Sequence, residues 1–260
     1  MIGIDSELIR EIVARDKRID NRSFDEYRNV VVEQGVVKQA EGSARVRIGN
    51  TEVIAGVKMG VGEPFPDTPN EGVLMVAAEF LPLASPEFES GPPGEESIEL
   101  ARVVDRAIRE SKAIDFKKLF ITEEKVWMVY IDIDILDDDG NLFDAACLAA
   151  VAALKNAKIP ELDEKQAPVY EKKGTQPLPM NSIPVSTTFV KIGNNILTDP
   201  SLAELEAMDA RLTVGTVNAG DGIQFCSMQK GGATGLAVED VEKILEMAER
   251  KGDELRKKIK

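Results

Sequence analysis

Three arginines at helical spacing form the group of side chains best suited to bind a charged ligand. Arg102, Arg106 and Arg109 follow a Gly-Pro-Pro-Gly segment at 91–94, where proline opposes helix formation. A helix is predicted from about Glu95, because the acidic residues there suit the positive end of a helix dipole. At about 100° per residue, the three guanidinium groups lie within an arc of roughly 60°. Such a row can bind a phosphate backbone.

The opposite side of this predicted helix is apolar and is expected to pack against the protein interior. Its members are Leu100, Val103, Val104, Ala107 and Ile108. The arginine side has a second interpretation, because exposed arginines are usually solvated and paired with nearby acids. Asp105 and Arg109 have the i,i+4 spacing for such a pair. From these residues alone, a solvated face and a phosphate-binding face both stay open.

The overall charge limits the kind of nucleic-acid contact that the chain can make. Its 260 residues carry a formal net charge of -14 and include no histidine. A strongly acidic protein does not coat nucleic acid by bulk electrostatics, so any such contact must be confined to a small basic strip. Without histidine the chain also lacks the commonest general acid–base group and the commonest metal ligand. Catalysis would need carboxylates, lysines or an assisting metal.

Neither end of the sequence resembles a targeting signal, because the first residues are acidic early and contain no apolar core of signal-peptide length. The longest apolar run, Ala145 to Leu154, is too short to cross a bilayer. Cys147 and Cys226 lie in apolar segments far apart and are expected to be reduced, buried thiols. We therefore expect a cytoplasmic protein with no membrane contact.

The order of the predicted elements indicates an α+β fold in two parts. Strands come first and a covering helix comes last in each half of the chain. The expected boundaries are 1–29 for an N-terminal helix and a surface arm, 30–159 for a first domain, 160–184 for a proline-rich linker and 185–260 for a second domain.

Alternating apolar residues predict strands in both domains. The expected strands are Val30–Glu33, Val36–Gln39, Ala44–Ile48, Thr51–Met59, Gly72–Glu79, Lys125–Leu136, Val185–Ile192, Asn195–Thr198, Arg211–Asn218 and Ile223–Gln229. Helices are expected from Asn141 to about Ala157 and from about Ala237 onward. The first of these two is apolar nearly all round, which is typical of a central helix covered on several sides.

Acidic residues around Gly140 suggest a comparison with metal-binding loops. If Gly140 is the sixth position of a calcium loop, Ile135 is the first and Ala146 the twelfth, so the calcium pattern fails. We expect no bound metal. Asn141 with Asp144 three residues later resembles a capping box, and we interpret Asp144 as a helix cap rather than a catalytic acid.

Three motifs, in order and at suitable separations, resemble the RNase PH family. The first combines Arg18-Ile-Asp-Asn-Arg22 with Gly35 and the segment at 41–55. The second joins Gly-Pro-Pro-Gly to the segment at 98–106, and the third covers 138–146. The similarity spans essentially the whole chain, and the second and third motifs resemble the non-catalytic branch of the family found in the archaeal exosome.

This resemblance implies a fold of two related α+β subdomains, an RNase PH-like fold. It also implies a hexameric ring, a trimer of heterodimers in which this chain alternates with a catalytic relative. RNA threads the central channel of such a ring and is shortened from its 3′ end by inorganic phosphate, which releases nucleoside diphosphates. Cap proteins with RNA-binding domains lie on one face of the ring.

The chain departs from the catalytic members where RNA and phosphate would bind. Glu95 and Glu96 stand where the catalytic relatives carry an arginine pair for RNA. The Asn-Leu-Phe-Asp segment at 141–144 replaces a Ser-Arg pair for phosphate, so no cation is present to bind the dianion. Asp199 matches the first of two catalytic acids, whereas Leu205 takes the place of the second. Phosphorolysis needs a phosphate clamp and a group or metal that stabilises the leaving oxygen.

We therefore predict a chain with no catalytic residues and no cofactor, which does not cut RNA by itself. By resemblance, Arg102 and Arg106 contact RNA beside the active site of a neighbouring subunit, and Arg109 lies one turn further along. The predicted partners are the catalytic RNase PH-like subunit, RNA-binding cap subunits and single-stranded RNA. Two alternatives stay open: an active phosphate-dependent exonuclease that forms a homo-oligomer, and an assembly scaffold whose arginines only bind acids at a subunit interface.

Overall fold

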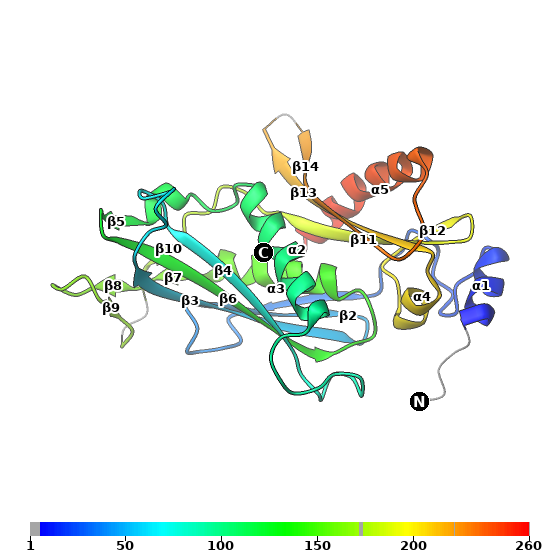
Figure 1. Cartoon of the computed structure of the whole chain (residues 1–260), viewed down its shortest axis with the longest axis horizontal. Helices are drawn as coiled ribbons and strands as arrows, with labels where there is room; N and C mark the ends of the chain where they lie inside the picture. The colour runs from blue at the N-terminus through cyan, green and yellow to red at the C-terminus, as the bar shows by residue number, and fades with distance from the viewer. Residues whose placement is uncertain (1–5, 172–173, 221, 260) are drawn as a thin grey trace.

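Two β-sheets, one from each half of the chain, lie on either side of a central helix (Figure 1). The computed structural model describes residues 6–171, 174–220 and 222–259. The sheet of the first half has the strand order β1 (Val30–Gln34), β2 (Gly42–Ile48), β3 (Thr51–Gly62), β6 (Lys125–Asp137) and β4 (Val73–Phe80), with β5 (Phe120–Thr122) paired to β6. β4 and β6 are parallel, and the other neighbours are antiparallel.

The sheet of the second half is antiparallel throughout. Its strand order is β12 (Asn195–Thr198), β11 (Val185–Ile192), β13 (Ala210–Ala219) and β14 (Gly222–Gly231). Adjacent residues of β11 serve opposite faces, as the twofold period of a strand requires. Phe189 packs with the C-terminal helix, whereas Thr188 bonds the central helix.

The helices pack between and beside these sheets. They are α1 (Ser6–Ala14), α2 (Glu95–Glu110), the 3-10 helix η1 (Phe116–Leu119), α3 (Leu142–Asn156), α4 (Leu202–Ala207) and α5 (Val238–Arg256). The segment between the domains adds short strand pairs, β7 (Lys158–Ile159) with β10 (Gln176–Pro177) and β8 (Glu161–Leu162) with β9 (Pro168–Val169).

The central helix is α3, and its sequence explains its position. Every residue from Asp144 to Leu154 is buried, because alanine-rich faces let β2, β3, β11 and α2 approach from several directions. Gly42 on β2 shows how close the contact is, since a Cβ atom there would lie 2.3 Å from the Ala153 carbonyl oxygen. The prediction of a covered central helix is confirmed.

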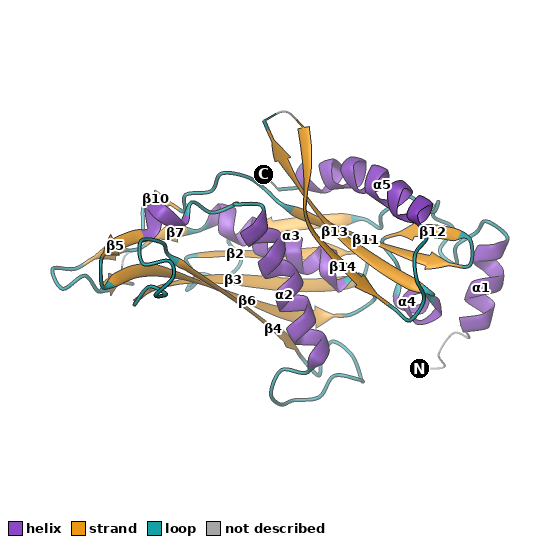
Figure 2. Ribbon diagram, turned by 45° about the horizontal axis from the view of Figure 1, so that its top comes forward, coloured by secondary structure: helices purple, strands orange, loops and turns teal. Residues whose placement is uncertain are grey.

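The helix that carries the arginines, α2, lies where the two halves meet. Its apolar side packs on β4 and α3, and it also touches β14 of the second sheet (Figure 2). The predicted inner residues Leu100, Val103, Val104, Ala107 and Ile108 are all buried. The arginine side of α2 is the exposed side of this helix.

The prediction of a strand at Val36–Gln39 is wrong. β1 ends at Gln34, and Gly35 then takes a left-handed conformation with φ of 73°, which suits glycine. The Val37 amide donates to the Ser43 hydroxyl at 2.8 Å instead of joining a ladder. The segment is a loop, and β1 pairs directly with β2. The other predicted strands are present, with boundaries that differ by a few residues.

Candidate nucleic-acid interface

The structure places all three predicted arginines on the exposed side of α2. Arg102, Arg106 and Arg109 are exposed, and the acidic residues Glu95 and Glu96 lie in the first turn of the same helix. Two carboxylates at that end complement the helix dipole. The exposed side of α2 is therefore acidic in its first turn and carries the three arginines further along.

The three arginines differ in their partners. Arg109 forms a bidentate pair with Asp105, through Nε to Oδ2 at 3.0 Å and Nη2 to Oδ1 at 2.6 Å. It also donates to the Leu74 carbonyl at 3.2 Å. Within the described residues, the side chains of Arg102 and Arg106 make no hydrogen bond and no ion pair. These two guanidinium groups are free to bind an anion, whereas the local pairing foreseen for Arg109 is present.

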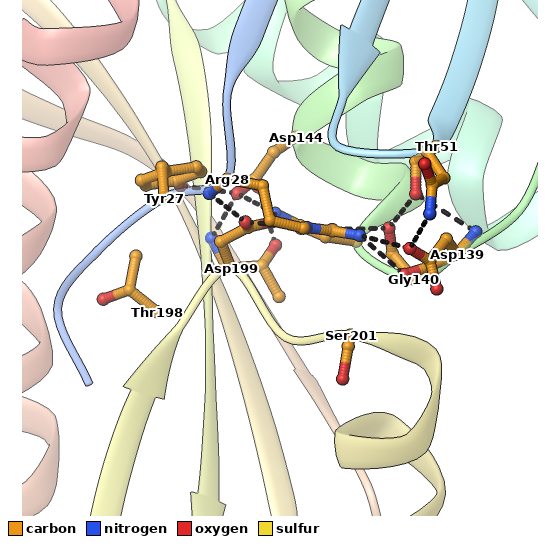
Figure 3. A network of polar contacts seen from close by, with 12 residues as sticks. Tyr27, Arg28, Thr51, Asp139, Gly140, Asp144, Thr198, Asp199 and Ser201 are labelled. Carbon is orange, nitrogen blue, oxygen red and sulfur yellow. Dashed lines mark hydrogen bonds and ion pairs between the residues drawn. The ribbon is translucent and has the colours of Figure 1, made fainter. Parts of the chain in front are cut away.

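Asn141 and Asp199, two of the residues that the family resemblance aligns with catalytic positions, are buried in a polar network between the domains (Figure 3). Asn141 adopts a left-handed backbone conformation with φ of 60° and is buried. Its amide nitrogen donates to Asp144 at 2.9 Å and to Asp199 at 2.7 Å. The side chain at this place therefore bridges two buried carboxylates and carries no positive charge for phosphate.

Asp199 is fully buried and its two carboxylate oxygens are already occupied. Arg28 binds it in a fork, Nε to Oδ2 at 2.9 Å and Nη2 to Oδ1 at 2.8 Å. Arg22 adds a bond to Oδ2 at 2.8 Å. Burial acts to raise the pKa of Asp199, but hydrogen bonds and charge from Arg28 and the bond from Asn141 lower it below its usual range. Asp199 is an ionised structural anchor in this network.

The same arginine also holds the turn before α3. The Arg28 guanidinium donates to the Asp139 carbonyl at 2.7 Å and to the Gly140 carbonyl at 3.1 Å. Figure 3 shows this side chain extended between Asp199 and the Asp139–Gly140 turn. Thr51 completes the contact, because its hydroxyl donates to the Gly140 carbonyl at 2.6 Å. One side chain thus joins the N-terminal arm, the first domain and the second domain.

The prediction that residues 16–28 form a surface arm is wrong for its arginines. Arg18 is 2% exposed, and its Nε donates to Glu204 of α4 at 2.8 Å. It also donates to the carbonyls of Thr198 and Asp199, at 2.9 and 2.8 Å. Arginine can be buried in this way because its planar fork satisfies several acceptors at once. The arginine side chains of the arm thus reach into the second domain, while most of the other arm residues are exposed.

The interpretation of Asp144 as a helix cap is also wrong. Its carboxylate is buried, and it accepts hydrogen bonds from the Tyr27 hydroxyl at 2.6 Å and from the Thr188 hydroxyl and amide at 2.7 and 3.0 Å. It joins α3 to β11 and to the arm. Burial raises the pKa of Asp144 to about 6, although the hydrogen bonds from Tyr27, Thr188 and Asn141 lower it.

Leu205, which the family resemblance aligns with a second catalytic acid, packs in the interior. Leu205 is partly buried against the cluster formed by α1, α4 and β11. The acid next to it, Glu204, is buried and paired with Arg18. Neither residue is placed to assist Asp199 in proton transfer or metal binding.

The remaining predictions concern metals, thiols and membranes. Within 6–171, 174–220 and 222–259, no group of three or more His, Cys, Asp or Glu side chains is arranged to hold a metal ion. Both cysteines are free, with Cys147 buried and Cys226 only partly so, which corrects the expectation that both are buried. No helix in the described part of the chain is long and apolar enough to span a bilayer.

Comparison with known proteins agrees with this architecture. The model of the 3′ exoribonuclease family, domain 1, matches residues 26–160, and that of domain 2 matches residues 182–251. The chain therefore belongs to the 3′ exoribonuclease, or RNase PH, family. The RNase PH-like two-domain fold predicted from the sequence is confirmed.

Several individual proteins are similar to this chain over nearly its whole length. The exosome complex component Rrp42 of Methanothermobacter thermautotrophicus is 49% identical over 249 residues, which cover 95% of this chain and 91% of that protein. The component of the same name from Thermococcus gammatolerans is 47% identical and covers 99% of this chain and 94% of its own. A chain from the solved structure of the Archaeoglobus fulgidus exosome with RNA bound to the active site has a TM-score of 0.90 and 46% identity, and the match covers 98% of this chain and 97% of that one.

Replacing Arg28 tests whether the polar network around Asp199 stabilises the folded protein. Arg28→Met should lower the free energy of unfolding by about 3 kcal/mol, because it leaves the buried Asp199 carboxylate with a much weaker set of partners. Urea denaturation of the purified chain measures this loss. Arg15→Met is the matched control, since Arg15 is 76% exposed in its pair with Glu11, and should cost less than about 0.5 kcal/mol. Similar losses for both variants would show that the network around Asp199 does not stabilise the fold in this way.

Asp144 should give a specific pH dependence of stability. Burial raises its pKa from the usual 3.8 to about 6 in the folded protein, so the folded state binds the proton more tightly. Stability should therefore rise as the pH falls from 7 to 5, by about 1 kcal/mol from this group. In Asp144→Asn this contribution should be absent, as urea denaturation at both pH values would reveal. Parallel pH profiles for the two proteins would show that Asp144 does not titrate in this range.

Proposed function

We propose that this chain is a non-catalytic, RNA-contacting subunit of a phosphorolytic 3′-to-5′ exoribonuclease ring of the archaeal exosome type. The observation that carries the proposal is a contrast between two sets of polar side chains. The place of the phosphate clamp and catalytic acid is filled by an internal ion-pair network around Asp199, while Arg102 and Arg106 on α2 are exposed and unpaired within the described residues.

The non-catalytic role follows from what phosphorolysis requires. Attack by phosphate needs a cation or donor cluster for the dianion and a group that stabilises the leaving oxygen. Asn141 carries no charge, and its side-chain amide donates to the buried carboxylates of Asp144 and Asp199. Asp199 is bound by Arg28 and Arg22, and Leu205 supplies no second acid. Such a chain contributes residues to the active site of a neighbouring subunit and has no active site of its own.

RNA contact follows from the charge distribution on α2. Arginine side chains that lack acidic partners bind phosphate strongly, because forming the new contact breaks no existing ion pair. Confining the site to Arg102 and Arg106 also reconciles RNA binding with a chain of net charge -14. Arg109, the third residue of the predicted site, already has Asp105 as a partner, so its contact with RNA stays a prediction.

The partners follow from the family and from the assemblies in which its members occur. The structure of one relative is an exosome with RNA bound to the active site, and other relatives are named as exosome components. For this chain we propose a catalytic RNase PH-like subunit as the partner in a trimer of heterodimers, with RNA-binding cap subunits on one face. No membrane partner is proposed. A cytoplasmic location stays a prediction.

Neutralising the two free arginines should weaken RNA binding by the assembled complex. In Arg102→Ala with Arg106→Ala, two phosphate contacts are lost, so the slope of log affinity against log salt should become shallower by about 1.4, at about 0.7 per contact on a single strand. Fluorescence anisotropy with a single-stranded RNA at several salt concentrations gives both the affinity and the slope.

The matched control removes the same charge elsewhere. Lys257 and Lys258 are exposed at the end of the chain, and Lys257→Ala with Lys258→Ala should leave the slope nearly unchanged. Native mass measurement of each complex separates RNA contact from assembly. If the α2 variant assembles and keeps its salt slope, the RNA-contacting role is excluded and the scaffold alternative gains support.

A further inference from the structure

Arg102 has two acidic neighbours on its own helix. Glu99 lies three residues before it and Asp105 three residues after it on α2. Side chains three apart on a helix have Cβ atoms about 5–6 Å apart and commonly form ion pairs. Either carboxylate could therefore neutralise Arg102 locally. Neither does so, because each is bound to a different arginine.

Glu99 is held by the second domain. Its Oε1 atom accepts from Arg211 Nη2 at 2.7 Å and from Gln229 Nε2 at 3.0 Å. Arg211 belongs to β13 and Gln229 to the neighbouring strand β14. The bond therefore crosses from the first domain to the second and pulls the carboxylate toward the sheet.

The surroundings of Arg211 fix its guanidinium in this position. The group stacks on the Phe143 ring, with Cζ 4.2 Å from the ring centroid. Opposite it on β14 is Gly231, where an added Cβ would come within 2.8 Å of Arg211 Nη2. Arg211 Nε is buried and has no hydrogen-bond partner among the described residues. The guanidinium therefore stays bound to Glu99, although a buried donor without a partner costs free energy and Nε has none.

Asp105 is held in a similar way by the other end of α2. Arg109 takes both of its carboxylate oxygens and is itself steadied by the Leu74 carbonyl of β4. Arg106 has an acid at one helical neighbour position, Glu110, four residues later. An arginine placed before its acid is the weaker order for such a pair, and the two do not pair in the described structure.

We propose that Arg211 and Arg109 are positioning residues for the RNA contact, which they serve by holding Glu99 and Asp105 away from Arg102. They act through the acids and need not touch RNA. This inference rests on the proposed function, since it explains how Arg102 keeps its charge available for phosphate. It also assigns the second domain a part in RNA binding, through β13.

A charge-balanced double variant tests the role of Arg211. In the assembled complex, Arg211→Met frees Glu99 to pair with Arg102, so the affinity for single-stranded RNA should fall about two- to fivefold and the salt slope should become shallower by up to about 0.7. Adding Glu99→Gln removes the freed acid and restores the net charge of the unmodified chain. Both affinity and slope should then return to their original values.

Arg109 provides a second, independent test on an exposed position. Arg109→Gln should lower RNA affinity by a similar factor, and Asp105→Asn in the same chain should restore it. These four variants and the unmodified chain are compared as complexes of verified mass, by anisotropy with the same RNA. Should Arg211→Met fail to assemble, the Arg109 pair still decides the sequestering mechanism, because Arg109 is a partly exposed surface residue.

The outcomes separate this inference from the proposed function. Loss of affinity that the acid-removing variants do not restore would mean that Arg211 or Arg109 contacts RNA or acts only on the fold, and would overturn the sequestering role. Unchanged affinity in both arginine variants would overturn it too. If replacing Arg102 and Arg106 has no effect on RNA binding, the proposed function itself fails, whatever the Arg211 and Arg109 variants show.

Discussion

The buried carboxylate of Asp199 is the constraint on which the rest of the structure depends. An ionised group taken out of water costs several kcal/mol unless charge and hydrogen bonds replace its solvation. Arg28 and Arg22 from the arm and Asn141 at the start of α3 supply both. To do so, they must come together from three parts of the chain. The position of the arm, the first turn of α3 and the beginning of the second domain are set by this one requirement.

The buried carboxylate of Asp199 and the exposed arginines of α2 belong to different parts of the molecule. Where the family resemblance places phosphate in catalytic members, both carboxylate oxygens of Asp199 already accept hydrogen bonds from Arg28, Arg22 and Asn141. The charge available for a ligand lies instead on α2, which the packing of α3 and β4 holds at the domain junction. Because Glu99 and Asp105 are bound by other arginines, Arg102 stays unpaired among the described residues on a chain of net charge -14.

Local patterns predicted much of this architecture, and long-range contacts explain what they missed. The spacing of apolar residues was sufficient for α2 and for the covered helix α3, because both patterns repeat within a few residues. The pair of Arg28 with Asp199 spans 171 positions, and no periodicity indicates it. Asp144 was misassigned for the same reason, since its partner Thr188 lies 44 residues further on.

The candidate site was predictable to a different extent at each residue. The exposure of Arg102, Arg106 and Arg109 follows from the helical period alone, and the Asp105–Arg109 pair from its i,i+4 spacing. The family resemblance added the positions at which this chain is expected to differ from catalytic members, Asn141 and Leu205. The role of Glu99 depends on Arg211, which reaches it from another domain, so it could be recognised only from the fold.

We would first measure phosphorolysis of a single-stranded RNA by this chain alone, by the catalytic relative alone and by the two mixed, with the mass of each assembly measured. We predict that this chain alone is inert, that the mixture forms a hexamer and that it releases nucleoside diphosphates faster than the relative alone. Phosphate-dependent degradation by this chain alone would show that it has an active site of its own, because the hydrogen bonds around Asp199 leave that carboxylate no free acceptor for the reaction.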